Sequence, residues 1–215
     1  MIQVLVVDDH ELVRTGFRRI LESSDEFEVA GEASNGEDAL KLVASLSPSV
    51  VLMDVLMPGM GGIAATGHIS RTFPDTKVIA LSVQFASPFP SQMSEAGALG
   101  YLTKGCSAEE LFEAIRTVNR GQPYIATELA RSLSMAILSG KEESAPFLDL
   151  TQRELQVLMM IVQGVKTQDI ADNLFLSPKT VSTYRYRLYG KLGVKTDVDL
   201  THLAIRHGML GGSPD

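Results

Sequence analysis

Five polar side chains in the N-terminal half of the sequence are of the types that handle phosphoryl groups. They are three carboxylates, one hydroxyl and one amine at the ends of short apolar runs: Asp8, Asp9, Asp54, Ser82 and Lys104. Carboxylates that converge repel one another unless a cation lies among them, and hard oxygen ligands beside a phosphate suit Mg²⁺. With the metal bound, one carboxylate can stay ionised and attack phosphorus. We therefore expect reversible phosphorylation of an aspartate.

The amine and the hydroxyl have separate tasks in this chemistry. Lys104 supplies a fixed positive charge for the transferred phosphoryl oxygens, and Ser82 can form a hydrogen bond with the same group. The competing interpretation is that the acids only cap helices, since Asp8, Asp9 or His10 could cap the helix that follows. One acid alone does not separate the two interpretations, but the whole set at the ends of predicted strands favours the phosphoryl site.

The elements that must position these residues alternate between two patterns. Apolar runs typical of buried strands occupy residues 4–7, 50–53, 78–81 and 101–102, with a weaker one at 29–30. Segments with helical spacing lie between them. Repeated βα units predict a parallel sheet covered by helices on both faces, and five units suit the flavodoxin-like strand order 2-1-3-4-5. Ligands bind at the carboxyl ends of such strands, where the polar residues are expected to meet.

A linker is expected to divide the chain into two domains. We predict a phosphoacceptor domain at residues 1–120, a helix and flexible linker at 121–147, and an all-α domain of four helices at 148–210. Residues 127–138 have helical spacing. Residues 139–146 are polar and include both Gly and Pro, which is typical of a linker.

The C-terminal domain has the pattern of a helix-turn-helix. Thr151 and Glu154 match a capping box, and Ser177 with Pro178 starts a helix that we expect to run to about Leu192. The polar face of that helix carries bases and hydroxyls: Lys179, Ser182, Thr183, Tyr186, Arg187 and Lys191. Two helices joined by a tight turn, with such a face on the second, suit docking in the major groove of DNA. A small helical interaction bundle is the alternative.

The net charge of -7 is distributed unevenly. Residues 1–140 hold 10 Lys and Arg against 17 Asp and Glu, whereas residues 141–215 hold 9 of each class. Residues 177–195 carry five bases and no acid. A polyanion responds to local charge within a Debye length of about 8 Å. The acidic total therefore does not exclude DNA binding.

Composition argues against several classes of protein. No apolar run approaches the ~20 residues of a membrane span. The N-terminus lacks the pattern of a signal peptide, so we expect a cytoplasmic protein. The single cysteine, Cys106, excludes an internal disulfide and a zinc site built from cysteines. The histidines are scattered, and we expect them to be surface, capping or helix residues, so that a phosphodonor histidine would belong to a partner.

Three motifs resemble the receiver domain of NarL/FixJ-type response regulators: Val7-Asp8-Asp9-His10, Met53-Asp54-Val55-Leu56-Met57-Pro58-Gly59-Met60-Gly61-Gly62 and Gly100-Tyr101-Leu102-Thr103-Lys104. The resemblance implies that Asp54 is the phosphoacceptor. It also implies a Mg²⁺ ion bound directly by Asp9, through water by Asp8, and by the main-chain carbonyl of Leu56. Asp54 would complete this set.

The same resemblance assigns a conformational switch. Ser82 and Tyr101 match the two switch positions, and with Lys104 they would bind the phosphoryl group or respond to it. In that family the hydroxyl moves toward the phosphoryl group and the aromatic ring turns inward. Many receivers have a proline after the lysine, with a cis peptide bond. This sequence has Gly105 there, where a cis bond would cost about 2.5–4 kcal/mol.

Residues 150–158 and 176–185 resemble a LuxR-type helix-turn-helix. The resemblance implies that the second helix contacts bases and phosphates, the bases through Ser182, Thr183 and Tyr186 and the phosphates through Lys179, Thr180, Arg187 and Lys191. The last helix of this family often forms the dimer contact on DNA. The whole chain resembles the GacA/UvrY group most, which implies a hybrid sensor kinase as phosphodonor and promoters of small regulatory RNAs as targets.

The sequence therefore predicts a two-component response regulator and not an enzyme. A sensor histidine kinase would phosphorylate Asp54, and phosphorylation would favour a homodimer on double-stranded promoter DNA, with no membrane contact. An aspartyl-phosphate phosphohydrolase is one alternative, but such enzymes place two acids two residues apart, whereas Asp8 and Asp9 are adjacent. A phosphorylation-independent DNA-binding protein is the other, and it would not need the intact acid set.

Overall fold

The computed structural model describes residues 1–82, 89–127, 129–131, 146–147, 149–207 and 209. Its contacts divide the chain into two compact units, an N-terminal unit that contains a sheet and a C-terminal helical unit. Most of the helix predicted at 127–138 and of the linker predicted at 139–146 lies outside the described residues. Among the described helices, none is both long and apolar enough to cross a bilayer.

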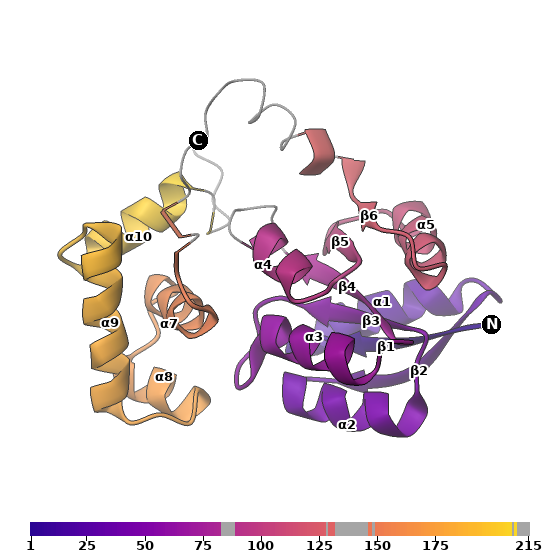
Figure 1. Cartoon of the computed structure of the whole chain (residues 1–215), viewed down its shortest axis with the longest axis horizontal. Coiled ribbons are helices and arrows are strands. Elements are labelled where there is room, and N and C mark those ends of the chain that lie inside the picture. Colours follow the sequence, from indigo (N-terminus) through magenta and orange to yellow (C-terminus); the bar gives the residue numbers. More distant parts are fainter. Residues whose placement is uncertain (83–88, 128, 132–145, 148, 208, 210–215) are drawn as a thin grey trace. The chain divides into compact units, whose positions relative to one another are not determined.

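A six-stranded parallel sheet forms the centre of the N-terminal unit (Figure 1). The strands are β1 (Ile2–Val7), β2 (Phe27–Ala33), β3 (Val50–Asp54), β4 (Lys77–Ser82), β5 (Gly100–Thr103) and β6 (Tyr124–Ile125). Their order is β2-β1-β3-β4-β5-β6, so the predicted flavodoxin-like order of the first five is confirmed. The central strands β1, β3 and β4 are almost wholly buried, which explains their continuous apolar sequences.

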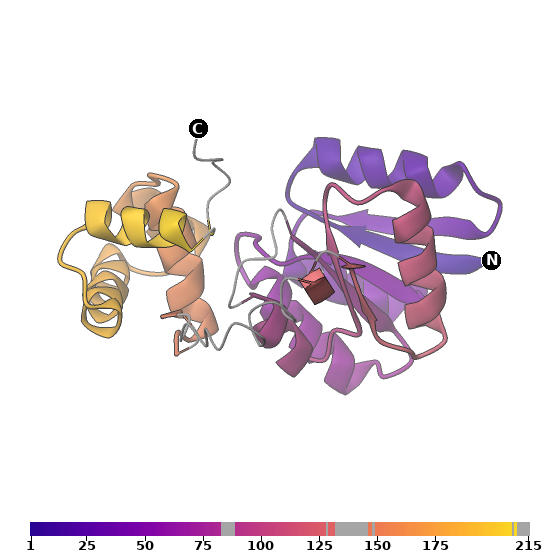
Figure 2. The ribbon, with the colours of Figure 1, turned by 90° about the horizontal axis from the view of Figure 1, so that it is seen from above.

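Helices cover both faces of this sheet (Figure 2). They are α1 (Glu11–Glu22), α2 (Gly36–Leu46), α3 (Gly61–Thr72), α4 (Phe89–Glu95) and α5 (Ala108–Asn119). Apolar side chains of α1 and α5, such as Phe17 and Ile115, share one core with β1, β3 and β4. The helices α2 and α3 pack against each other on the opposite face, where Ala39 and Ile69 are buried.

The short strand β6 extends the sheet beyond the five strands expected. Its backbone is hydrogen-bonded to β5, since Tyr124 N donates to Leu99 O at 2.9 Å and Ala126 N donates to Tyr101 O at 3.2 Å. In the parallel register, Tyr101 lies opposite Ile125. The chain that leaves α5 is therefore fixed to the strand that carries Tyr101 before it continues toward the C-terminal unit.

The C-terminal unit contains α7 (Gln152–Val162), α8 (Thr167–Asn173), α9 (Pro178–Leu192) and α10 (Asp197–Arg206). The predicted capping box of Thr151 and Glu154 is confirmed, as are Ser177 as N-cap and Pro178 at the first turn of α9. Buried apolar residues of all four helices form its core, among them Leu158, Ile170, Val181, Leu188 and Leu200.

Candidate functional site

The polar residues predicted at the strand ends lie together at the carboxyl edge of the sheet. Asp8 follows β1, Asp54 ends β3, and Lys104 follows β5. The Lys104 Nζ atom is 2.7 Å from Asp8 Oδ2 and 2.9 Å from Asp54 Oδ2. Both carboxylates are buried, so this amine compensates two charges that water does not reach. The convergence expected from a parallel sheet is present.

The environment of Asp54 changes its acidity. Burial raises its pKa to about 7, and the negative charge of Asp8 adds to this effect, although Lys104 opposes it. The N–H of Leu56 donates to Asp54 Oδ1 at 3.2 Å. Burial by itself lowers the pKa of Lys104, but the charges of Asp54 and Asp8 outweigh burial and raise it above the usual value. The lysine therefore stays charged beside a carboxyl group that holds its proton more tightly than usual.

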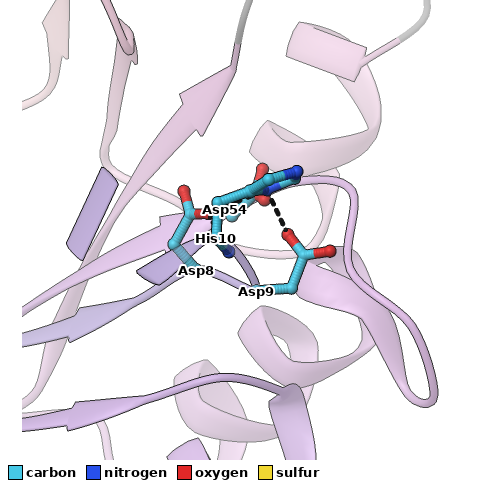
Figure 3. A group of neighbouring side chains, drawn as sticks. All are labelled: Asp8, Asp9, His10 and Asp54. Atoms are coloured by element: carbon cyan, nitrogen blue, oxygen red, sulfur yellow. Dashed lines mark hydrogen bonds and ion pairs between the residues drawn. The ribbon is translucent and has the colours of Figure 1, made fainter. Parts of the chain in front are cut away.

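Asp9 and His10 complete a cluster of four possible metal ligands (Figure 3). One ligand atom from each of Asp8, Asp9, His10 and Asp54 lies within 4.8 Å of the others. Asp8 Oδ2, Asp9 Oδ1 and Asp54 Oδ2 are buried oxygens; the first and third face the Lys104 amine, and the second faces the His10 ring. Three carboxylates and one lysine leave an excess of negative charge, which a hard divalent cation would neutralise. The residues thus fit a metal ion.

The sequence analysis predicted His10 only as a surface, capping or helix residue. It does occupy the N-cap of α1, without a side-chain capping bond, and its side chain is 68% exposed. The ring, however, faces the acids, because its Nδ1 atom lies 2.8 Å from Asp9 Oδ1 and 3.4 Å from Asp8 Oδ1. The only signal for this in the sequence was its position directly after the acid pair.

The hydroxyls of Ser82 and Tyr101 are joined beside this cluster. Burial raises the pKa of Tyr101 to about 12, while its hydrogen bond with Ser82 acts in the opposite direction. Both side chains are buried, so the aromatic ring points inward. The two residues predicted as switch positions are therefore in direct contact.

A glycine allows the backbone to pass close to Asp54. A Cβ atom built on Gly62 would lie 1.9 Å from the main-chain oxygen of Asp54. The Gly62 N–H donates to Val55 O at 3.2 Å. No other residue type fits this approach, so the start of α3 and the end of β3 form one rigid support for the Asp54 side chain.

In the C-terminal unit, α9 presents one polar face that the helical core does not cover. Its exposed or half-exposed residues are Lys179, Thr180, Ser182, Thr183, Tyr186, Arg187 and Lys191, which is the whole set predicted to contact DNA. Tyr186 is 71% exposed. Ser182 Oγ and Thr183 Oγ1 each donate to a main-chain carbonyl one turn earlier. An exposed helix with bases and hydroxyls has the composition of a major-groove reader.

Comparison with known proteins assigns both units. Residues 4–116 match the family model described as response regulator receiver domain, and residues 148–204 match the one described as bacterial regulatory proteins, luxR family. The chain is 50% identical to response regulator UvrY of Escherichia coli K12 over 97% of this chain and 96% of UvrY. It is also 50% identical to response regulator GacA of Pseudomonas aeruginosa over 98% of both chains.

The chain is a response regulator. It is a two-component transcription regulator of the GacA/UvrY-like kind with a LuxR-type DNA-binding helix-turn-helix, and it is not an enzyme. A solved structure of the RcsB response regulator from Salmonella typhimurium superposes with a TM-score of 0.72 at 26% identity over 94% of this chain and 95% of RcsB. RcsB bound to promoter rprA with the phosphomimetic BeF3⁻ superposes with a TM-score of 0.70 at 25% identity over 94% of this chain and 98% of RcsB.

Two bases of α9 in this response regulator are engaged within the helical unit. Lys191 Nζ donates to Glu154 Oε2 at 2.7 Å and to Asp149 O at 3.0 Å. Arg185 Nε lies 3.3 Å from Asp197 Oδ1. These pairs hold α9 against its neighbours, which a count of basic residues in the sequence does not reveal. The phosphate contact implied for Lys191 remains a prediction.

Proposed function

We propose that this response regulator accepts a phosphoryl group on Asp54 from a sensor histidine kinase, and that the donor is a hybrid kinase, as the resemblance to the GacA/UvrY group implies. The observation that supports this is the buried Asp54 carboxylate, 2.9 Å from Lys104 Nζ and beside Asp8 and Asp9. Asp8 shares the burial, the Lys104 contact and the metal-ligand cluster, and the resemblance of residues 53–62 to the receiver motif selects Asp54 as the acceptor.

The proposed transfer uses these groups in defined roles. An oxygen of Asp54 forms a bond to phosphorus while the P–N bond of the donor phosphohistidine breaks, and the imidazole leaves with the electron pair. Asp9, Asp54 and the Leu56 carbonyl would hold a Mg²⁺ ion directly and Asp8 would hold it through water, and the ion would supply positive charge for the phosphoryl oxygens. Lys104, now paired with two carboxylates, turns to a phosphoryl oxygen and compensates the charge that arrives.

We expect the Ser82 hydroxyl, at the end of β4, to transmit the presence of the new group to Tyr101, with which it shares a hydrogen bond. When Ser82 forms a hydrogen bond to the phosphoryl group, its present bond with Tyr101 must change. Tyr101 belongs to β5, whose backbone holds β6 and the chain beyond it. A change at Asp54 thus reaches the segment that leads to the DNA-binding unit, and favours a homodimer competent for promoter DNA.

The output proposed for α9 is sequence-specific binding of double-stranded promoter DNA. Ser182, Thr183 and Tyr186 would face bases, while Lys179, Thr180, Arg187 and Lys191 would lie at phosphates. The resemblance to the GacA/UvrY group implies genes of small regulatory RNAs as one class of target. Genome-wide occupancy, measured with the wild type and with Asp54→Asn, tests whether such promoters are bound and whether binding needs phosphorylation.

Phosphorylation from acetyl phosphate and Mg²⁺ tests the site itself. Asp54→Asn is expected to abolish incorporation of phosphate, whereas Asp75→Asn, which neutralises an exposed aspartate before β4, is the matched control and keeps it. Incorporation by Asp54→Asn at the wild-type stoichiometry would show that the acceptor lies elsewhere.

A further inference from the structure

The His10 ring is placed where a metal ligand would be. Its Nδ1 atom lies 2.8 Å from Asp9 Oδ1 and 3.4 Å from Asp8 Oδ1. Two donor atoms bound side by side to one octahedral ion at about 2.1 Å are about 3.0 Å apart. The observed separations lie on either side of that value. One ion could therefore bind this nitrogen together with the carboxylate oxygens.

The short distance between His10 Nδ1 and Asp9 Oδ1 requires a positively polarised partner between their lone pairs. A neutral imidazole nitrogen that faces carboxylate oxygens at this distance must carry a proton or a metal ion, because two lone pairs repel. Lys104 contacts Asp8 and Asp54, whereas the Asp9 carboxylate faces the His10 ring. Asp9 Oδ1 is buried and accepts no conventional hydrogen bond from the described residues. Asp9 Oδ1 and His10 Nδ1 thus offer an oxygen and a nitrogen ligand side by side (Figure 3).

A metal site with both carboxylate oxygens and an imidazole nitrogen as ligands favours some metal ions over others. Mg²⁺ favours oxygen ligands, whereas imidazole suits the later first-row transition ions. We propose that His10 Nδ1 is a ligand of the metal site in this receiver, and that it gives the site selectivity for divalent first-row transition ions such as Co²⁺ over Mg²⁺. This inference rests on the proposed function, because it concerns the same metal site.

Metal titrations of untagged full-length protein test the preference. The wild type, His10→Ala and His68→Ala are titrated with Co²⁺ and with Mg²⁺ by isothermal calorimetry. His68 is an exposed histidine on α3 and serves as the matched control. We expect His10→Ala to lose about 10-fold or more in Co²⁺ affinity and less than about 3-fold in Mg²⁺ affinity, while His68→Ala retains both affinities.

Spectroscopy and a second variant keep the result interpretable. Pulsed electron paramagnetic resonance of bound Mn²⁺ should show ¹⁴N coupling from an imidazole in the wild type and in His68→Ala, and none in His10→Ala. His10→Asn keeps a residue suited to the N-cap of α1 and offers an oxygen in place of nitrogen. It should lose Co²⁺ selectivity while it folds as the wild type does.

Two results would overturn the inference. One is an equal loss of Co²⁺ and Mg²⁺ affinity, or no loss, in the His10 variants. The other is ¹⁴N coupling that persists in His10→Ala. In both cases a wild type that binds Mg²⁺ leaves the proposed function intact. A wild type that binds neither ion overturns the metal site as well, so the two failures are distinguishable.

Discussion

Substitution of Glu154 by Gln isolates the charge that fixes α9 to α7. Glu154 Oε2 accepts from Thr151 N at 2.8 Å, from Thr151 Oγ1 at 2.9 Å and from Lys191 Nζ at 2.7 Å. Hydrogen bonds to a charged group contribute about 1 kcal/mol more than neutral ones. The three bonds share one oxygen and do not add fully. Because the Lys191 side chain is 38% exposed and solvent screens its charge, we take the contribution of the ion pair to the free energy of unfolding as about 0.5–1 kcal/mol.

We therefore expect Glu154→Gln to lower the free energy of unfolding of the helical unit by about 2 kcal/mol. For a unit of this size, that corresponds to a fall in Tm of roughly 10 °C. Lys191→Met removes the ion pair with Glu154 and the exposed hydrogen bond to Asp149 O, and should cost about 1 kcal/mol. Asp169→Asn, which neutralises an exposed acid on α8, is the control and should change stability by less than about 0.5 kcal/mol. Calorimetry of the full-length protein measures all three.

The dependence on pH gives the prediction a second readout. Burial alone raises the pKa of Glu154, but the hydrogen bonds from Lys191 and Thr151 outweigh burial and hold the pKa below its usual value. A depressed folded pKa stabilises the protein above the unfolded pKa of about 4.3, and this contribution is lost as pH falls through the folded pKa. The gap between wild type and Glu154→Gln should thus close at acid pH. A Tm within about 2 °C of the wild type at pH 7, or a gap that does not change with pH, would refute the reasoning.

Three further substitutions test separate features. Arg187→Ala should weaken binding to every promoter sequence and reduce the slope of log affinity against log salt by about 1, as measured by fluorescence anisotropy. Arg185→Ala is the control and should leave the slope nearly unchanged, because Arg185 pairs with Asp197. Phe175 has a positive φ of 54° and is 86% exposed, so Phe175→Asn should stabilise the helical unit by about 0.5–1 kcal/mol in thermal unfolding; destabilisation would contradict this account. Gly62→Ala places a methyl group 1.9 Å from Asp54 O and should lower both the Tm and the rate of phosphorylation.

The sequence predicted the order of five strands because each central strand is a continuous apolar run that needs cover on both faces. It predicted the meeting of Asp8, Asp54 and Lys104 because parallel strands end at one edge. It did not predict β6, because two residues carry no periodicity and their pairing depends on where α5 returns the chain.

The side-chain contacts within the sites were less accessible from sequence. The position of the His10 ring follows from the backbone after β1 and not from any spacing of residues. The bases of α9 all belong to one helix, yet Lys191 and Arg185 contact acids on or beside other helices, whereas Lys179 and Arg187 lie exposed. Charge pattern alone cannot separate a base that stabilises the fold from one that is available to DNA.

The two residues of β6 also determine where the receiver could be cut from the rest of the chain. They cover the backbone of β5, which would otherwise be an open edge able to pair with a strand of another molecule. A fragment that stops at Asn119 would expose the carbonyls of Leu99 and Tyr101 and invite association between copies. The shortest receiver that keeps β5 paired on both sides ends after Ala126, and evolution could exchange output domains after that residue without disturbing the strand that carries Tyr101.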